Sequence, residues 1–539
     1  MIWVWLHLGR YMDLWKPPVA LSSREQRIMK RLVRTRKLFG FLRLHRHELF
    51  DDAFQAELAA VYRPTGAGAE PVSPAVLCMA MLLQAYLGTS DAEAVEMTVL
   101  DLRWQMVLDC LGAEEPAFGQ GTLQQFRERV IAHGLDQRLL ERTIELAKET
   151  REFDYKKLPK ALRLSVDSRP FEGAGRVEDT FNLLGHSARK VLQLVARVTG
   201  QPFDELCREA GIPLLLAPSI KAALDINWND PAQKDVALEV LLSQVDSLDR
   251  WVERRHFDLA NPLAAYLQAI AQVRQQDIEE VDGKVQLRQG VAPDRRISIE
   301  DAEMRHGRKS KSKRFNGYKQ HIGANLDSHL IHACAVTPAN RPEEEASAEL
   351  EDDLARQHVE VAELAIDRAY VNSPLAAHVH ERGGEVVAKP WRVRNRLDLF
   401  TKLDFKINMR DLTITCPSGE VEHFEPGDVV EFDPEACGAC SQRGHCTLSA
   451  SGRGRTVHIA EDERTQQRFR KLITTKSGRA RLRERTGIEH CLAHIAARQG
   501  PKARYRGTRK NLFDLRRVAA IQNLETIQRR VALALNVAK

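Results

Sequence analysis

The sequence predicts a mixed α/β protein, and three observations support this class. Residues 161–167 alternate between apolar and polar side chains, which is typical of a half-buried strand. Two more strand-like runs, 318–326 and 329–337, are separated by Asp327 and Ser328, as in a hairpin. The stretches around these strands instead show the capping residues and apolar spacing of helices.

The first helical region covers residues 47–150. In the stretch SPAVLCMAMLLQAYLG, Ser73 is a candidate N-cap, Pro74 fits the first turn and Gly88 fits the C-terminal stop. The sequences SDAE at 90–93 and TLQQ at 122–125 both predict capping boxes at the start of further helices.

Residues 1–46 form an N-terminal extension. Its start, MIWVWLHLGRY, is too short for a membrane span and lacks the basic region of a signal peptide. Five of the nine cysteines are scattered through apolar stretches, as is typical of reduced thiols in a core. We therefore expect a cytoplasmic protein with no membrane partner.

Asp167 and Asp367 each end a predicted strand, the second of them in VEVAELAIDRAY. Carboxylates at the ends of neighbouring strands would meet, and they would repel each other without a cation. Oxygen ligands of this kind suit Mg²⁺ or Mn²⁺. The sequence therefore predicts a metal site on a sheet within residues 161–399, which a helical insertion at 186–290 interrupts.

We expect a third ligand from the basic helical segment 461–539, which we assign to the same domain. In RLRERTGIEHCLAHIAARQG, apolar residues recur at helical spacing, and Glu489 lies one step from their stripe. Arg485 precedes Glu489 by one turn on the same side. An ordinary surface ion pair between the two is the alternative, and Glu484 is a rival ligand.

Four further cysteines lie between these parts, in residues 400–460, with the spacing C-x20-C-x2-C-x5-C. This segment is too poor in apolar residues to build a core of its own, and four thiolates at such spacing favour a structural Zn²⁺ site. Four reduced thiols in a loop are the alternative, whereas a redox pair would explain only two of them. The predicted ligands are Cys416, Cys437, Cys440 and Cys446.

The charge of the chain is uneven. The formal net charge is +6, but residues 464–539 contain 20 Lys and Arg against 4 Asp and Glu, which gives +16 and leaves about −10 for the rest. A second basic run extends from Arg305 to Lys319. Such segments favour a polyanionic partner such as nucleic acid, and a solvated helical face with excess arginine is the alternative.

Several segments also resemble parts of one family. They are SVDSRPFEGAGRVEDTFNLLG, NGYKQHIGANLDSHLIHACAVTPAN, ELAIDRAY, RERTGIEHCLAH, ARYRGTRKNLFDLRRVAAIQNL and, near the N-terminus, LLQAYLGTSDAEAVEMTVLDLRWQMVLDCLG. Taken together, and in their order along the chain, they resemble the DDE transposases of bacterial insertion sequences. The resemblance covers roughly 45–190 and 315–535, and Ala369 stands where the second Asp motif usually has Gly.

The resemblance implies an RNase H-like catalytic core preceded by a helical domain for DNA binding or assembly, with a small zinc-ribbon-like insertion at 400–460. It implies two Mg²⁺ or Mn²⁺ ions in each active site, which would activate a water or a DNA 3′-OH and stabilise the leaving oxygen. In the set of residues named next, the three acids would hold the metals, and the Arg, Lys and His would assist catalysis. The implied catalytic residues are Asp167, Asp367, Glu489, Arg485, Lys319 and His321.

Basic and aromatic residues near these motifs are candidate DNA contacts. The aromatic member could stack on an unpaired base, although a partly buried Trp is the alternative. The tail arginines could instead serve the fold by pairing with acids of the core. The candidates are Arg308, Lys309, Lys311, Lys313, Arg314, Lys389, Trp391, Arg504, Arg506, Arg509 and Lys510.

The function that we predict is metal-dependent cleavage and strand transfer at the ends of an insertion sequence. The partners would be double-stranded DNA of the element ends and of the target, on which the protein would assemble as a homodimer at the nucleoid. A nuclease on the same fold without strand joining, or an inert zinc-stabilised DNA-binding protein, are the alternatives.

Overall fold

The computed structural model describes residues 14–32, 36–62, 71–150, 161–255, 262–393, 398–450 and 452–537, with side chains to 530. The apolar start of the N-terminal extension and the end of the basic stretch after Trp391 lie outside the described residues. No single helix in the described ranges is long and apolar enough to cross a membrane, and one bent pair, 74–87 with 91–100, meets the criteria only when taken together.

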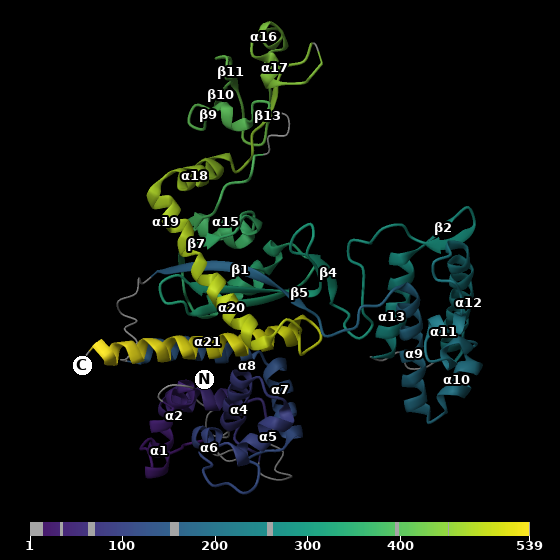
Figure 1. Cartoon of the computed structure of the whole chain (residues 1–539), viewed down its shortest axis with the longest axis vertical. Coiled ribbons are helices and arrows are strands. Elements are labelled where there is room, and N and C mark those ends of the chain that lie inside the picture. Colours follow the sequence, from purple (N-terminus) through teal and green to yellow (C-terminus); the bar gives the residue numbers. More distant parts are fainter. Residues whose placement is uncertain are drawn as a thin grey trace, which may run out of the picture.

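Helices form the N-terminal part of the fold, at the bottom of Figure 1. Their bounds are α1 Ser23–Arg31, α2 Lys37–Leu49, α3 Asp52–Ala59, α4 Pro74–Leu87, α5 Asp91–Leu100, α6 Leu102–Leu108, α7 Gln120–Ala132 and α8 Leu135–Glu149. The expected limits of α4 are confirmed, since Ser73 is its N-cap, Pro74 starts it and Gly88 ends it at φ 76°.

The two predicted capping boxes had different outcomes. Ser90 and Glu93 form both reciprocal hydrogen bonds of a capping box at the start of α5. The prediction at 122–125 is wrong, because α7 begins at Gln120 after Gly119 and Thr122 lies inside the helix. Helices also begin at Ser23, within the segment that we assigned to the extension.

A central sheet follows, in the order β6-β5-β1-β7-β8, with β4 paired to the start of β5. The strands β6, β5 and β1 are antiparallel, whereas β1, β7 and β8 are parallel. The chain order of strand, hairpin, helix, strand, helix, strand and helix is the predicted one. The strands are β1 Leu162–Glu172, β4 Arg305–Arg308, β5 Arg314–Asn325, β6 Ile331–Pro338, β7 Val361–Ile366 and β8 Glu385–Val387.

Helices cover both faces of this sheet. On one face, α14 Ser347–Arg356 and α15 Pro374–Glu381 bury Leu164, Val166 and Ala335. On the other face, α20 Thr486–Gln499 and α21 Thr508–Val537 pack against the sheet. From Ala333 to Val336 in β6, successive side chains alternate between the two cores, as the pleat requires.

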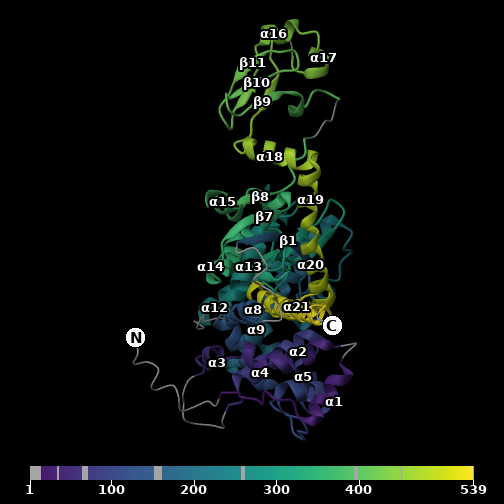
Figure 2. The same ribbon diagram turned by 90° about the vertical axis from the view of Figure 1, so that its left-hand side faces the viewer.

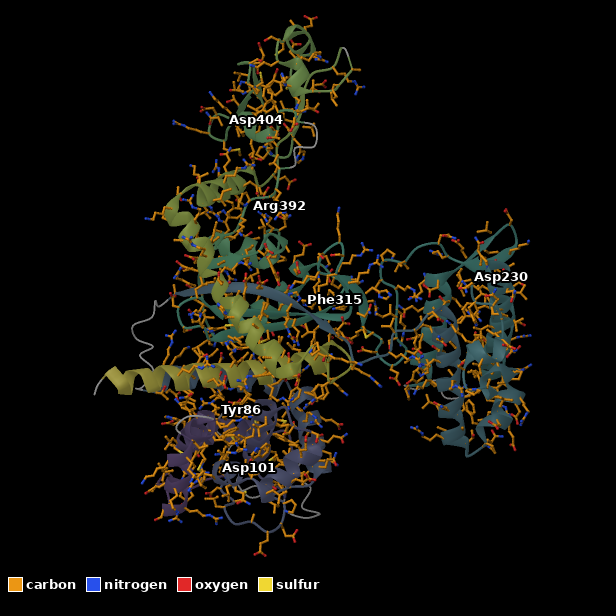
Figure 3. The ribbon with its side chains drawn as sticks, in the orientation of Figure 1. Tyr86, Asp101, Asp230, Phe315, Arg392 and Asp404 are labelled. Carbon is orange, nitrogen blue, oxygen red and sulfur yellow. The ribbon has the colours of Figure 1, made fainter. Side chains whose placement is uncertain are left out.

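The helix α21 joins the sheet to the N-terminal helices. It packs against β6 on one side and against α4 and α8 on the other, as Figure 1 shows. One apolar core therefore runs from the N-terminal helices through α21 to the sheet. Figure 3 places Tyr86, at the end of α4, directly under α21.

The helical insertion stands apart from the sheet, on the right of Figure 1. It begins at Thr180, six residues before the predicted limit, and has an apolar core of its own. Its elements are α9 Thr180–Thr199, α10 Phe203–Glu209, η2 Pro213–Leu216, α11 Ile220–Leu224, α12 Pro231–Arg255, α13 Leu263–Asp277, β2 Ile278–Val281 and β3 Lys284–Leu287.

The cysteine-containing segment forms a small unit at the far end of the molecule from the N-terminal helices, as Figures 1 and 2 agree. Our premise that it cannot build a core is wrong, because Ile414, Phe424, Phe432 and Ile459 are buried together. Its elements are η5 Lys402–Asp404, β9 Lys406–Asn408, β10 Thr413–Thr415, β11 Val421–His423, β12 Val429–Glu431, α16 Pro434–Ala439, α17 Arg443–Cys446 and β13 Thr456–His458. The chain returns to the core through α18 Glu463–Thr474 and α19 Lys476–Glu484.

Candidate active site

Asp167 and Asp367 lie side by side on the central sheet. The parallel strands β1 and β7 pair Val166 with Ile366, so each Asp follows directly at the same level. Each carboxylate accepts a hydrogen bond from the next backbone N–H, at 2.8 Å from Ser168 and 2.7 Å from Arg368. Whereas Asp367 ends its strand as predicted, β1 runs five residues past Asp167 to Glu172.

Burial and neighbouring charges change the pKa of Asp167. Burial raises it above the ordinary value for an Asp, because the side chain is only 18% exposed. The positive charge of Arg485 lowers the pKa, and the negative charge of Asp367 raises it further. The site therefore concentrates negative charge that a cation would relieve.

Arg485 connects Asp167 to Glu489. Its guanidinium donates to Asp167 Oδ2 at 2.8 Å and to Glu489 Oε1 at 3.2 Å. Glu489 is 57% exposed, on the margin of the buried stripe of α20. Glu484 instead pairs with Arg163 near the start of β1, four residues before Asp167. Arg485 thus links Glu489, not the rival acid, to Asp167.

A pocket of about 340 Å³ opens beside Glu489. Its walls come from the end of β8, from α18 and from the continuous face of α19 and α20. Four of its lining residues are cationic and one is acidic. The lining residues are Lys389, Ile473, Arg479, Leu482, Arg483, Arg485, Thr486 and Glu489.

Lys319 and His321 lie on β5, but their surroundings differ. Lys319 donates to the carbonyl of Arg341 at 2.8 Å and lies 3.7 Å from Glu343. The ring of His321 is fully buried, and burial lowers its pKa to about 3, so it is neutral. Its place beneath the site supports a positioning role rather than contact with a substrate.

Sequence reasoning missed the groups that surround these two side chains. The hydroxyl of Tyr370 lies 2.6 Å from Nδ1 of His321, and Thr337 lies 2.9 Å from Nε2. Ser168, next to Asp167, donates to Glu343 at 3.1 Å. Tyr370 is visible three residues after Asp367, but nothing in the acidic run 343–345 marks Glu343 as a neighbour of the site.

All four predicted zinc ligands lie in the small unit, and each is partly exposed. Burial raises the pKa of the Cys446 thiol, and the other three thiols raise it further. The backbone N–H of Arg455 donates to Sγ of Cys437 at 3.5 Å, and Ser418 lies 3.0 Å from Sγ of Cys440. Four soft thiol donors suit Zn²⁺.

The carboxylates and the four cysteines are chemically suitable metal ligands, but their side chains are not arranged around a common metal position. Among the residues that the structure describes, no group of three or more His, Cys, Asp or Glu is placed to hold a metal ion. At the carboxylates the physical reason is visible, because Arg485 occupies the space between Asp167 and Glu489.

The basic run at 305–319 forms a hairpin instead of a loop. The strands β4 and β5 pair Arg308 with Arg314, and every residue from 308 to 314 is exposed. Figure 3 places Phe315, at the start of β5, on the side of the sheet nearer the helical insertion. The hairpin presents its positive charges to solvent, as a phosphate contact would require.

Residues after β8 are also accessible. Trp391 is 44% exposed, and its backbone N–H donates to Oε1 of Gln466 at 2.9 Å. Lys389 is exposed as well. Figure 3 shows Arg392 between the core and the cysteine-containing unit, so this stretch lies where the two parts connect.

The tail arginines make contacts within the protein. Arg504 donates to the carbonyls of Thr89 and Gly88 at 3.1 and 3.0 Å. Arg506 pairs with Glu300, and Arg509 pairs with buried Asp136. These contacts favour the alternative that the arginines serve the fold, whereas Lys510 is exposed.

This difference between hairpin and tail predicts two salt dependences of DNA binding. Replacing Lys309, Lys311 and Lys313 by Ala should lower the slope of log affinity against log salt by up to about 2–3. Replacing Arg504, Arg506 and Arg509 should leave that slope nearly unchanged and lower the melting temperature. Affinity measured at several salt concentrations, together with thermal melts, checks both; a flatter slope in the tail variant would contradict the second expectation.

Two protein-family models match parts of the chain. Residues 415–528 match the family model described as a Transposase DDE domain, and residues 32–129 match a Transposase domain (DUF772). These two matches support an insertion-sequence DDE transposase. A search of the curated proteins and a search of the solved structures each found no match.

The two matches cover different parts of the chain and different candidate site residues. The first contains the four cysteines and Glu489, and the second contains most of the N-terminal helices. Neither contains Asp167 or Asp367, but Arg485, which lies inside the first match, donates to both Asp167 and Glu489. DDE transposases act on DNA and generally use divalent metals, and the family implies an RNase H-like core.

Proposed function

We propose that this transposase cleaves DNA at the ends of an insertion sequence and joins the freed ends to target DNA, with Asp167, Asp367 and Glu489 as its catalytic acids. One observation carries the proposal. The register of β1 with β7 puts the two aspartates side by side, and Arg485 links the third acid to Asp167.

The side chains of the site would act on the phosphate in different ways. A divalent metal held by Asp167, Asp367 and Glu489 would supply Lewis-acid charge to the phosphate and to the attacking oxygen. The backbone N–H groups that follow the two aspartates fix the orientation of their carboxylates. Arg485, which donates to two of these acids, would add positive charge where negative charge develops in the transition state.

The alternatives differ in what the protein leaves behind. A nuclease on the same fold would cut the element ends without joining them, and an inert DNA-binding protein would do neither. The adjacency of the two aspartates, with Glu489 linked to Asp167 through Arg485, favours an active site over an inert core.

A plasmid assay tests the proposal. Supercoiled plasmid that carries the element's own ends is incubated with the protein, with and without Mg²⁺, and both cleavage and joining to a second DNA are measured. We expect metal-dependent cutting at the ends and joined products. Cutting without joining would indicate the nuclease, and no cutting with intact end binding would indicate the inert protein.

The cysteine-containing unit is proposed to hold one structural Zn²⁺ through Cys416, Cys437, Cys440 and Cys446. Purified protein should then carry about one tightly held zinc per chain, as a closed four-thiolate site would. Chelation should increase hydrogen exchange within 400–460 while the central sheet stays protected. Metal analysis and thiol titration check this; no zinc, with four freely titratable thiols in the native protein, would contradict it.

The partners follow from the same proposal. The transposase would bind double-stranded DNA of the element ends and of the target, with the exposed 308–314 hairpin as one contact. We propose that two copies assemble on the two ends at the nucleoid, which light scattering of the protein with and without end DNA would test.

A further inference from the structure

In the candidate active site, the positive charge of Arg485 lies between two of the acids that would bind a metal ion. Its guanidinium lies 2.8 Å from Asp167 Oδ2 and 3.2 Å from Glu489 Oε1. Both acids would have to give up these bonds, or share them, in order to bind a metal together. Metal binding by both acids would therefore be favoured by a ligand that accepts hydrogen bonds from Arg485 in their place.

The pocket beside Glu489 offers a place for such a ligand, because it contains positive charge without matching negative charge. Arg479 and Arg483 are one turn apart on α19, and Lys389 faces them from the end of β8. Within the described residues, Lys389 and Arg483 have no hydrogen-bond or ion-pair partner. Arg479 is held in place by its bonds to the carbonyls of Ile473 and Thr474, at 3.2 and 2.7 Å.

Several arginines elsewhere in the basic C-terminal region are neutralised instead. There Arg481, Arg498 and Arg516 each pair with a carboxylate. Cations that converge without a counter-charge repel one another, and an anion that enters the pocket relieves that repulsion. A pocket of about 340 Å³ leaves ample space for a phosphate group between these side chains.

We propose that this pocket binds a backbone phosphate of the DNA strand beside the bond that is cut, and that the bound phosphate competes with Asp167 and Glu489 for Arg485. The inference rests on the proposed function for the identity of the anion as DNA. Since Arg485 lines the pocket, a phosphate there can accept from its guanidinium while the two acids become free for metal. DNA binding and metal binding would then strengthen each other by the same factor.

The first experiment measures DNA affinity without added divalent metal. The double variant Lys389→Ala/Arg483→Ala is compared with Lys471→Ala/Lys476→Ala, which removes two exposed cations of α18 and α19 that do not line the pocket. We expect the pocket variant to lower the slope of log affinity against log salt by up to about 1.8 and the control to leave it nearly unchanged. Equal behaviour of the two variants would overturn the phosphate site.

The second experiment measures Mn²⁺ binding by calorimetry, with and without a duplex that ends at the cleavage position, so that no bond can be cut. We expect the duplex to raise Mn²⁺ affinity by about 5- to 150-fold, the usual range of such coupling. The Lys389→Ala/Arg483→Ala variant should lose most of this gain. The Asp367→Ala protein with the same duplex serves as the blank for metal bound by DNA itself.

The variant Arg485→Ala tests whether the phosphate competes with the two acids for Arg485 or whether the DNA merely attracts Mn²⁺ by its charge. It should bind Mn²⁺ without DNA more tightly than the natural protein and gain little when the duplex is added. Unchanged Mn²⁺ affinity in this variant, or no effect of the duplex on the natural protein, would overturn the competition. A protein that cuts and joins DNA without this coupling refutes the inference alone, whereas one that shows the coupling but never cuts refutes only the proposed function.

Discussion

Replacing Asp167 or Asp367 by Ala should reduce cleavage of end DNA by at least about 10²–10³-fold, because the variant loses a ligand of the metal that would stabilise the charge of the transition state. Binding of end DNA should persist, because the removed charge is negative and repels phosphate. A gel assay of plasmid cleavage beside a binding assay with the same ends measures both effects.

The third acid has a matched control in the same helical segment. Glu489→Ala should lose cleavage like the aspartate variants, whereas Glu484→Ala should cut nearly normally, since Glu484 pairs with Arg163 at the start of β1. Thermal melts of both variants show whether any loss comes from unfolding. Normal cutting by the first variant and none by the second would mean that the third catalytic acid is Glu484.

Replacing Asp136 by Ala should destabilise the packing of α21 by about 3–5 kcal/mol, the usual cost of removing one partner from a buried ion pair. The Asp136 side chain is 0% exposed and accepts hydrogen bonds from Arg509 and from Arg516, which lies 3.2 Å away. The variant would leave Arg516 buried with one carboxylate instead of two.

Hydrogen exchange is the suitable measurement, because a chain with several structural units need not unfold in one step. Faster exchange is expected in α8 and α21, with little change in the helical insertion. Lys510→Ala, an exposed neighbour on α21, should change stability by less than about 0.5 kcal/mol. Equal protection of α21 in the Asp136 variant and the natural protein would show that the pair contributes nothing.

Local patterns predicted the elements of the core well. The alternation before Asp167, the hairpin at 327–328 and the strand that ends at Asp367 were all readable because side-chain period and turn residues act over a few positions. The capping residues of α4 were readable for the same reason. The misplaced start of α7 shows the limit, since a Thr and a Gln three residues apart occur inside helices as well as at their ends.

Contacts between distant segments could not be predicted in this way. Asp136 and Arg509 meet across 373 residues of chain, so the sequence showed only an excess of arginine in the tail. The buried place of His321 depends on Tyr370 and Thr337, which reach it from other elements. The alternation along β5 predicts on which face of the strand His321 lies, but it does not predict which residues cover its side chain.

The position of α21 between the N-terminal helices and the sheet has a consequence for synthesis on the ribosome. The apolar face of α4 and α8 is complete once residue 149 has been made, but its covering helix begins only at Thr508. At 5–20 residues per second that face waits roughly 20–70 s for its partner. During this interval the nascent protein is a substrate for chaperones, and a message cut short before this helix would yield a protein that exposes the same face permanently and is prone to aggregate.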